Sequence, residues 1–335
     1  MTRMPLTLPF NGVSPRIAEP FGGAGARAAV LGRVQMGPRA ILGAGATIRA
    51  DGEDVTIGED FVLGARGLIH ISGGQYATHV GDRVAAGRNS VIHACTVGQD
   101  CVIGEDSIIL DGSTLGDGVV LMPGTIVFPR SRLDPNTIYT GVPASPQGPA
   151  DGALRARLRA AILDAAKQDR IPAAIGHVPG IFVARTARIE GKIEAGEDAS
   201  VFFGCDLTAL GGRIRIGART NVQDNSILQA KARDLVIGAD TTIGHNVQMS
   251  DCSIADGALI GMGARIAPGT EVQTDVLVAA GTVTEPGQVL TSGKLWGGNP
   301  ARPISAMSDA RRAVFNSTIT HYCAYAAAFR AAQGD

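Results

Sequence analysis

Hydrophobic positions recur every six residues over most of the chain. From Leu31 onward an aliphatic residue is commonly followed by glycine, as in LGAGAT, IGEDFV, VGDRVA and IGEDSI. These hexads lack the three- and four-residue spacing that an amphipathic helix needs. Each hexad instead predicts one short strand and one tight turn, where Gly, Asp and Asn accept a left-handed backbone. Because three hexads make one triangular coil, we expect a parallel β-helix whose aliphatic residues stack inside a prism.

The hexads form two runs that are separated by a helical segment. The first run ends at TIYTGVPASP, and the segment GALRARLRAAILDAAKQDR that follows has apolar residues at helical spacing. The second run ends at LWGGNPARPI, after which Ser308 can cap a last helix that reaches about Ala332. We therefore expect a mainly β chain built by tandem duplication, with a first β-helix domain at 1–150, a helix and linker at 151–182, a second β-helix domain at 183–304 and a C-terminal helix at 305–335.

Aligning the hexads coil by coil places two histidines on one face of the first copy, which we name the third face. Its hexads begin at Ile48, Ile69 and Ile92, and the residues in their second positions are Arg49, His70 and His93. In the second copy the equivalent residues are Thr208, Gln229 and Ser250. The third face is thus expected to carry stacked, chemically active side chains in the first copy only.

The neighbouring face, which we name the second face, shows the opposite distribution. In the second copy its hexads begin at Val222 and Ile243 and carry Gln223, Asp224 and His245. The first copy has Gly64, Ala65 and Arg88 in those places. Each copy therefore keeps polar chemistry on one face and has lost it on the other, which indicates a division of labour after duplication.

Composition and charge exclude several other functions. The net charge is −1 and the pI is about 6.6, so the chain does not attract nucleic acid electrostatically. The five cysteines are odd in number and have no CxxC spacing, so we expect buried thiols rather than disulfides or a thiolate zinc site. The first residues lack the apolar core of a signal peptide, and no apolar run is long enough to span a membrane. We expect a cytoplasmic protein with no membrane partner.

The second copy contains the motifs of a known family. The segments IGARTNVQDNSILQ, IGHNVQMSDCSI, GMGARIAPG and WGGNPAR, with HYCAYAAAF in the last helix, resemble the γ-class carbonic anhydrases. The resemblance covers nearly all of both halves. It implies left-handed coiling of the β-helix and homo-oligomers that pack through the side faces of their prisms.

The resemblance also implies a zinc site that neither copy can complete by itself. In the family, three histidines from two neighbouring prisms bind the metal. Their positions in this chain hold His70 and His93 in the first copy and His245 in the second. Zinc is the expected metal, although a site of three imidazoles also tolerates cobalt or ferrous iron. The sequence leaves open whether the two prisms dock within one chain or between chains.

The remaining expectations concern the reaction. The family reaction converts carbon dioxide to bicarbonate, a lyase activity in which zinc activates a water molecule. The resemblance implies that Gln223 orients this water with Asn221 nearby, and that Arg49, Asp51 and Asp224 pair across the prism interface. We treat His79, His177 and His321 as structural. A catalytically inactive scaffold is a second interpretation, and a hexapeptide-repeat acyltransferase with His93 as general base is a third.

Overall fold

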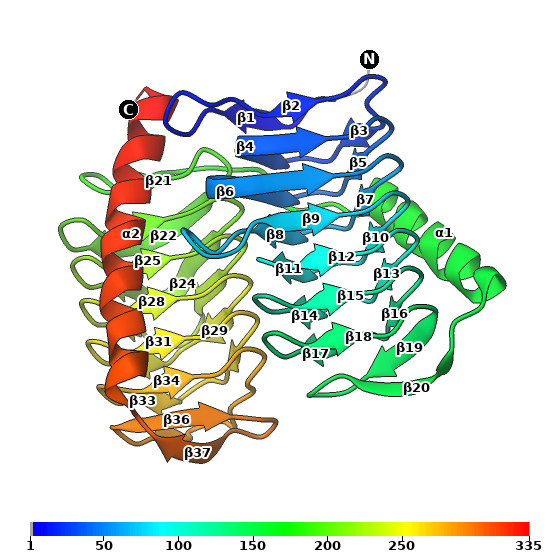
Figure 1. Cartoon of the computed structure of the whole chain (residues 1–335). Helices are drawn as coiled ribbons and strands as arrows, with labels where there is room; N and C mark the ends of the chain where they lie inside the picture. Colours follow the sequence, from blue (N-terminus) through cyan, green and yellow to red (C-terminus); the bar gives the residue numbers. More distant parts are fainter. Residues whose placement is uncertain (1–2, 335) are drawn as a thin grey trace. The chain divides into compact units, whose positions relative to one another are not determined.

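The computed structural model describes residues 3–334. The chain divides into two compact units, Met1–Pro172 and Ala173–Asp335, which we call unit 1 and unit 2. Each unit is a stack of triangular coils with one helix alongside it (Figure 1). Unit 1 holds the first copy of the hexads and unit 2 holds the second copy.

Three faces of short parallel strands form the prism of unit 1. Strands β1 (Leu6–Leu8), the first halves of β4 (Ala29–Met36) and β6 (Thr47–Ile57), β8 (Leu68–His70), β11 (Val91–His93), β14 (Ile108–Ile109) and β17 (Ile126–Val127) form the third face. The first face contains β2 (Arg16–Ile17), the second halves of β4 and β6, β9 (Thr78–Val80), β12 (Thr96–Val97), β15 (Thr114–Leu115) and β18 (Arg132–Leu133). The second face contains β3 (Gly23–Ala24), β5 (Ile41–Leu42), β7 (Val62–Leu63), β10 (Ala85–Ala86), β13 (Val102–Ile103), β16 (Val120–Leu121), β19 (Thr137–Thr140) and β20 (Ser145–Pro149).

The register of unit 1 agrees with the hexad alignment. Ile48 pairs with Ile69, and Ile69 pairs with Ile92. These side chains are fully buried and belong to one continuous core. A column of stacked aliphatic residues removes apolar surface from water on every coil, so the core of the prism is as long as the stack.

The corners of the coils adopt the left-handed conformation that the hexads predict. Asp60 has φ 56°, Asn89 has φ 54° and Gly124 has φ 73°. Asp and Asn tolerate this region better than other residues that carry a Cβ, because their short polar side chains can form local hydrogen bonds. The polar hexad positions therefore mark the corners, and the aliphatic positions mark the core.

Unit 1 begins earlier than the hexads indicate. Leu6 pairs with Ala29, and Ile17 pairs with Met36, so a coil precedes Leu31, where the six-residue period becomes visible. This segment contains several prolines, and the Glu19–Pro20 bond is cis. Proline supplies no N–H to a strand ladder and interrupts the hexad pattern without preventing the coil.

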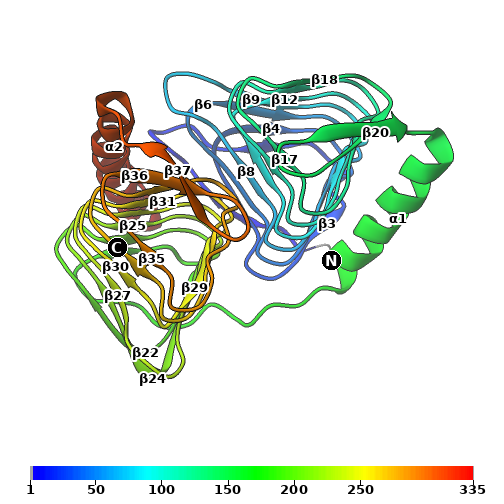
Figure 2. The same cartoon turned by 90° about the horizontal axis from the view of Figure 1, so that it is seen from below.

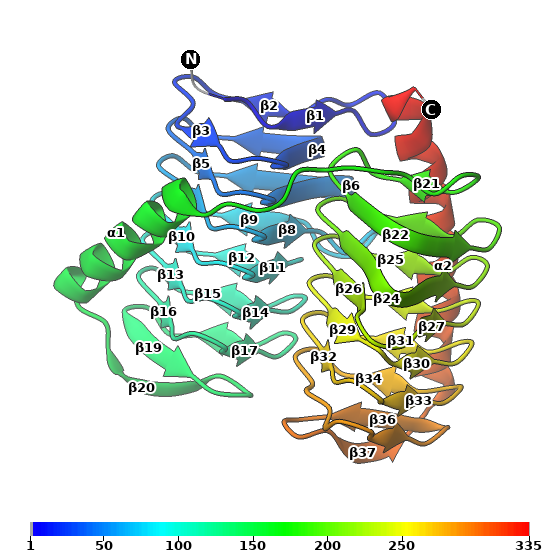
Figure 3. The same ribbon diagram turned by 180° about the vertical axis from the view of Figure 1, so that it is seen from behind.

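Helix α1 (Gly152–Gln168) covers the second face of unit 1 (Figure 3). Asp151 caps its N-terminus by accepting a hydrogen bond from the Leu154 N–H at 2.7 Å. Ala166 of the helix is buried against Val62 and Ala85 of the sheet. Arg159 donates to the carbonyl oxygen of Arg83 at 2.6 Å, which ties the helix to a corner of the prism.

Unit 2 repeats this architecture. Its third face contains the first halves of β22 (Arg188–Ala195) and β24 (Asp206–Ile216) with β26 (Ile227–Ala230), β29 (Gln248–Ser250) and β32 (Arg265–Ile266). Its first face contains the second halves of β22 and β24 with β27 (Leu235–Ile237), β30 (Ser253–Ile254), β33 (Glu271–Val272) and β35 (Val289–Leu290). Its second face contains β21 (Phe182–Val183), β23 (Ser200–Val201), β25 (Asn221–Val222), β28 (Thr242–Ile243), β31 (Leu259–Ile260), β34 (Leu277–Val278), β36 (Lys294–Gly297) and β37 (Arg302–Ala306). Figure 2 shows both stacks from below, where the coils of each unit overlie one another.

Helix α2 (Asp309–Gln333) covers the second face of unit 2. Ser308 is its N-cap, as the sequence predicts, and Gly334 ends it in the left-handed conformation with φ 76°. The ring of Phe329 stacks on Phe182 of β21, with 6.5 Å between the ring centroids. Within residues 3–334, no helix combines the length and the hydrophobicity that a bilayer-spanning segment needs.

Candidate metal centre

The third face of unit 1 brings its predicted site residues together. His70 ends β8 and His93 ends β11, and the two residues are direct partners in the parallel register. Arg49 follows Ile48 on β6, which pairs with Ile69 of β8. Side chains in the same position of successive parallel strands point to the same side of a sheet, so the register alone stacks these three residues.

A continuous line of polar contacts links these side chains. The Arg49 guanidinium donates to Oδ2 of Asp51, and both side chains are fully buried. Oδ1 of Asp51 lies 2.9 Å from Nε2 of His70. Nδ1 of His70 lies 3.2 Å from Nε2 of His93. Asp51 therefore links the buried arginine to the histidine pair.

Asp111, which the sequence analysis did not select, extends this line beyond His93. Its Oδ1 lies 2.6 Å from Nδ1 of His93. Burial raises the pKa of Asp111, but His93 and a hydrogen bond from Ser72 lower it, and the net pKa lies below the ordinary value of an aspartate. Asp111 is therefore a carboxylate at neutral pH, so each histidine of the pair has a carboxylate at one ring nitrogen.

The two carboxylates determine which ring nitrogens carry lone pairs. In a neutral imidazole the nitrogen beside a carboxylate carries the proton, and the other nitrogen is an acceptor or a metal ligand. The acceptor nitrogens are then Nδ1 of His70 and Nε2 of His93, which face each other at 3.2 Å. Two lone pairs at this distance repel each other unless a proton or a metal cation lies against both.

The histidine pair also fits a metal by its dimensions. Two imidazole nitrogens that bind a tetrahedral zinc at about 2.0–2.1 Å lie roughly 3.3 Å from each other. The separation of 3.2 Å between Nδ1 of His70 and Nε2 of His93 is close to that nitrogen–nitrogen distance. Histidine ligands commonly donate their second ring N–H to a carboxylate, as Asp51 and Asp111 allow here. The donor set therefore suits a divalent metal.

The second face of unit 2 holds the third predicted histidine. His245 follows β28, and its Nδ1 lies 3.2 Å from Oδ2 of Asp224, which follows β25. The other oxygen of Asp224 accepts the backbone N–H of Phe203 at 3.0 Å. Nε2 of His245 lies 3.3 Å from the hydroxyl of Tyr322 on α2. His245 thus also has one ring nitrogen beside a carboxylate, and its Nε2 faces the hydroxyl of Tyr322.

The predicted amides lie on the same face of unit 2. Nε2 of Gln223 donates to Oδ1 of Asn221 at 3.0 Å. Nδ2 of Asn221 donates to Oγ1 of Thr242 at 3.1 Å. These bonds fix the orientation of the Gln223 amide, so its carbonyl oxygen is the group that remains to accept a hydrogen bond from another molecule.

In each unit, the positions equivalent to the other unit's histidines hold residues with other roles. On the third face of unit 2, Gln229 pairs in register with Thr208 and with Ser250, and the three residues are half-buried. On the second face of unit 1, Arg88 forms an ion pair with Asp169, which directly follows α1. The position that holds His245 in unit 2 therefore serves in unit 1 to hold the end of the helix.

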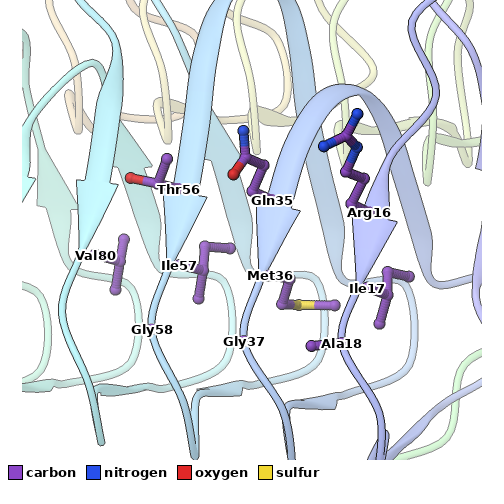
Figure 4. Close-up of a pocket in the computed structure, with 10 residues that line it drawn as sticks. All are labelled: Arg16, Ile17, Ala18, Gln35, Met36, Gly37, Thr56, Ile57, Gly58 and Val80. Carbon is purple, nitrogen blue, oxygen red and sulfur yellow. The ribbon is translucent and has the colours of Figure 1, made fainter.

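Two of the other histidines have other partners, and Cys205 lies beside a predicted site residue, because its Sγ donates to the backbone carbonyl of Gln223 at 3.0 Å. Nδ1 of His79 lies 2.7 Å from Oγ1 of Thr56, and His321 stacks on Tyr325. Every cysteine is a free thiol. An open groove of about 540 Å³ lies on the first face. In Figure 4, the polar ends of Arg16, Gln35 and Thr56 point away from the apolar side chains of the groove. The groove includes none of the predicted site residues.

Comparison with known proteins supports both the repeat and the family resemblance. Residues 95–129 match the family model "Hexapeptide repeat of succinyl-transferase". Gamma carbonic anhydrase 1, mitochondrial, of Arabidopsis thaliana is 34% identical over 148 residues, which are 42% of this chain and 54% of that protein. Carnitine operon protein CaiE of Escherichia coli (strain K12 / DH10B) is 31% identical over 134 residues, which are 39% of this chain and 67% of that protein. The chain thus spans about half the length of the plant relative.

A solved structure resembles the chain over both units. The crystal structure of a protein assigned as an acetyltransferase, from Desulfovibrio desulfuricans G20, matches with a TM-score of 0.58 and covers 91% of this chain and 78% of its own. Its sequence is 15% identical, so this similarity concerns the fold alone. The fold class that the hexads predict, β-helix prisms that are each followed by a helix, is confirmed.

Proposed function

Because the chain belongs to the γ-class carbonic anhydrase-like family of left-handed, hexapeptide-repeat β-helix proteins, as a tandem duplication, we propose that it is a zinc enzyme that hydrates carbon dioxide reversibly. The proposed site is composite. His70 and His93 of unit 1 and His245 of unit 2 hold the metal, which requires that the third face of one unit meets the second face of the other, within a chain or between chains.

The distribution of residues between the units supports this proposal most strongly. Unit 1 keeps the two histidines of the third face and has Arg88 at the position of the third. Unit 2 keeps His245 and has Gln229 and Ser250 at the positions of the other two. Random loss of residues has no reason to respect faces, whereas one shared site explains why each unit retains the part that its partner lacks.

The carboxylate partners support the same assignment. Asp51, Asp111 and Asp224 lie 2.9, 2.6 and 3.2 Å from a ring nitrogen of His70, His93 and His245, respectively. Such partners fix the ring orientation and raise the basicity of the nitrogen that binds a metal. The contacts of His70 and His93 are hydrogen bonds, and that of His245 is an ion-pair distance. A carboxylate beside each of three histidines is expected of a metal-ligand set.

Unit 2 also supplies the polar groups that a hydration reaction needs. A bound zinc supplies a water molecule that ionises near neutral pH. In our proposal the Gln223 carbonyl accepts a hydrogen bond from that water and orients it towards carbon dioxide. Asn221 holds Gln223 at 3.0 Å. We propose that the third face of unit 1 and the second face of unit 2 are kept in register by Arg49, Asp51 and Asp224. A charged hydrogen-bonded pair contributes a defined geometry as well as binding energy.

The test is metal content together with carbon dioxide hydration. The purified full chain should contain about one zinc per chain and accelerate hydration in a stopped-flow pH-indicator assay. His245→Ala and His93→Ala should each lose zinc and activity. His79→Ala is the control, because His79 lies on the first face beside Thr56, and it should keep both. A wild-type chain that neither contains zinc nor takes it up would overturn the proposal.

The match to the succinyl-transferase repeat supports a second candidate function, which can be tested with the same purified protein. Acyltransferases of this repeat class use coenzyme A, and His93 would then be a general base. Acetyl-CoA binding in calorimetry with no zinc present would favour this alternative. Stoichiometric zinc without hydration above background would favour a catalytically inactive scaffold.

A further inference from the structure

The contact between His93 and Asp111 arises from the coil that follows the histidine pair. Strand β14 pairs with β11 so that Ile109 lies beside Ile92. Asp111 follows the end of β14, at a corner where the Gly112 N–H donates to the carbonyl oxygen of Ala94 at 2.8 Å. From this corner the Asp111 carboxylate reaches the imidazole of His93, where Oδ1 and Nδ1 are 2.6 Å apart.

Asp111 is held from its other side by the loop after His70. Ser72 donates a hydrogen bond to the carboxylate. The Tyr76 ring lies against Gly112, where a Cβ would be 3.3 Å from Cζ of the ring. Gly112 has φ 70°, so a side chain there would be strained as well as crowded. The carboxylate therefore has a fixed position between the loop and the imidazole, and its side chain is only 32% exposed.

We propose that Asp111 is the positioning residue of His93: it selects the tautomer with the proton on Nδ1 and orients the ring so that Nε2 faces His70. This inference rests on the proposed function, because the purpose of such positioning is metal binding. Without Asp111, the imidazole can carry its proton on Nε2, which removes the lone pair that a metal needs. A carboxylate partner of this kind typically changes metal affinity about 10- to 100-fold.

The first measurement needs no metal. In ¹⁵N-histidine-labelled wild-type protein, long-range ¹H–¹⁵N correlation should show His93 protonated on Nδ1 at neutral pH. Asp111→Ala should move the proton to Nε2 in a substantial fraction of molecules. Asp111→Glu should restore the wild-type tautomer in part. An unchanged tautomer in Asp111→Ala would overturn the inference, whether or not the chain binds zinc.

The second measurement is metal affinity, from competition with a chromogenic chelator. Asp111→Ala should weaken zinc binding about 10- to 100-fold and change the visible spectrum of the cobalt-substituted protein. Asp117→Asn is the matched control, because Asp117, one hexad after Asp111, accepts from Gln99 and forms no hydrogen bond with a histidine within residues 3–334. Equal zinc affinity in wild type and Asp111→Ala would contradict positioning for a metal. Failure of the wild type itself to bind zinc, with His93 protonated on Nδ1, would instead refute the proposed function.

Discussion

Nδ1 of His70 and Nε2 of His93 lie 3.2 Å apart on successive coils, and each imidazole has a carboxylate at its other nitrogen. The hexad register makes the two residues neighbours, and the carboxylates direct their lone pairs towards each other. An arrangement of this kind is electrostatically unfavourable unless a proton or a metal cation lies against both nitrogens, so it indicates a metal site more specifically than the number of histidines alone.

The second unit shows how this pair can be removed without harm to the fold. Gln229 and Ser250 occupy the equivalent positions and pair in the same register. We therefore expect His70→Gln with His93→Ser to leave circular dichroism and thermal stability nearly unchanged and to abolish zinc binding. Elemental analysis after zinc loading checks this expectation. Full zinc occupancy in the double variant would exclude the histidine pair as ligands.

The buried ion pair of Arg49 and Asp51 should be important for stability. Both side chains are fully buried, so Asp51→Asn removes the charge of an adjacent carboxylate from a buried guanidinium. We expect a loss of about 3–5 kcal/mol in the free energy of unfolding. Asp100→Asn is the control, because its partner Arg83 is 43% exposed, and exposed pairs contribute about 0.2–1 kcal/mol. Urea denaturation should separate the two variants, and equal losses would contradict this account.

Much of the candidate site can be predicted from sequence because the hexad period sets the register. Once Ile48, Ile69 and Ile92 are aligned, Arg49, His70 and His93 must share a face. Asp111 could not be identified in this way, since corner positions such as Asp60 also carry aspartate, and only the side-chain direction distinguishes it. The sequence does contain one indication of Asp111: this residue belongs to the hexad that begins at Ile109, which follows the hexad of His93 on the third face.

Two other features were missed for different physical reasons. The contact between Tyr322 and His245 depends on how α2 is rotated about its axis, and a periodic pattern on the strands does not determine that rotation. The coil before Leu31 lies inside the β-helix domain predicted at 1–150, but its strands could not be placed because prolines interrupt the hexads there. Both features depend on tertiary packing and not on the local period.

The cysteines should differ strongly in reactivity. Burial raises the pKa of Cys101 and of Cys252 to about 12, so the reactive thiolate at pH 8 is about one part in ten thousand. Cys323 on α2 is half-buried. We expect iodoacetamide at pH 8 to label Cys323 first in the folded chain and all five cysteines in urea. Peptide mass spectrometry checks the order, and early labelling of Cys101 would contradict the buried position.

Asp251 should make the free energy of unfolding of unit 2 depend on pH in the acidic range. Burial raises its pKa, but the backbone N–H groups of Ala232, Arg233 and Lys231 lower it, and the net shift is downward. A lowered pKa in the folded state means that the stabilisation is complete above the ordinary aspartate pKa and is lost as the pH falls through the folded value. We expect Asp251→Asn to cost about 1.5–3 kcal/mol at pH 7.

This cost should begin to shrink as the pH falls below the ordinary aspartate pKa of about 4, because unfolded wild-type chains then take up a proton that the folded state does not yet bind. Asp240→Asn is the control, since Asp240 pairs with Arg219 at the exposed surface. Denaturation midpoints of wild type and Asp251→Asn should approach each other as the pH falls from 7 to 3. Curves that stay parallel over this range would show that the carboxylate charge has no part in holding the loop at residues 231–233.

The role of Gln223 should appear in the rate of hydration and not in metal binding. Its amide is held by Asn221, and within residues 3–334 Gln223 forms no hydrogen bond with any of the three histidines. We therefore expect Gln223→Ala to keep its zinc and to lose about 10²- to 10³-fold in kcat, the usual effect of removing one oriented polar group that acts in the transition state. Gln229→Ala is the matched control, because Gln229 lies on the third face of unit 2, where the first copy has His70, and it should keep full activity. Stopped-flow rates normalised to zinc content separate the two effects. If Gln223→Ala lost zinc in proportion to activity, Gln223 would instead support the metal site, and the orientation of water would have to be assigned to another group.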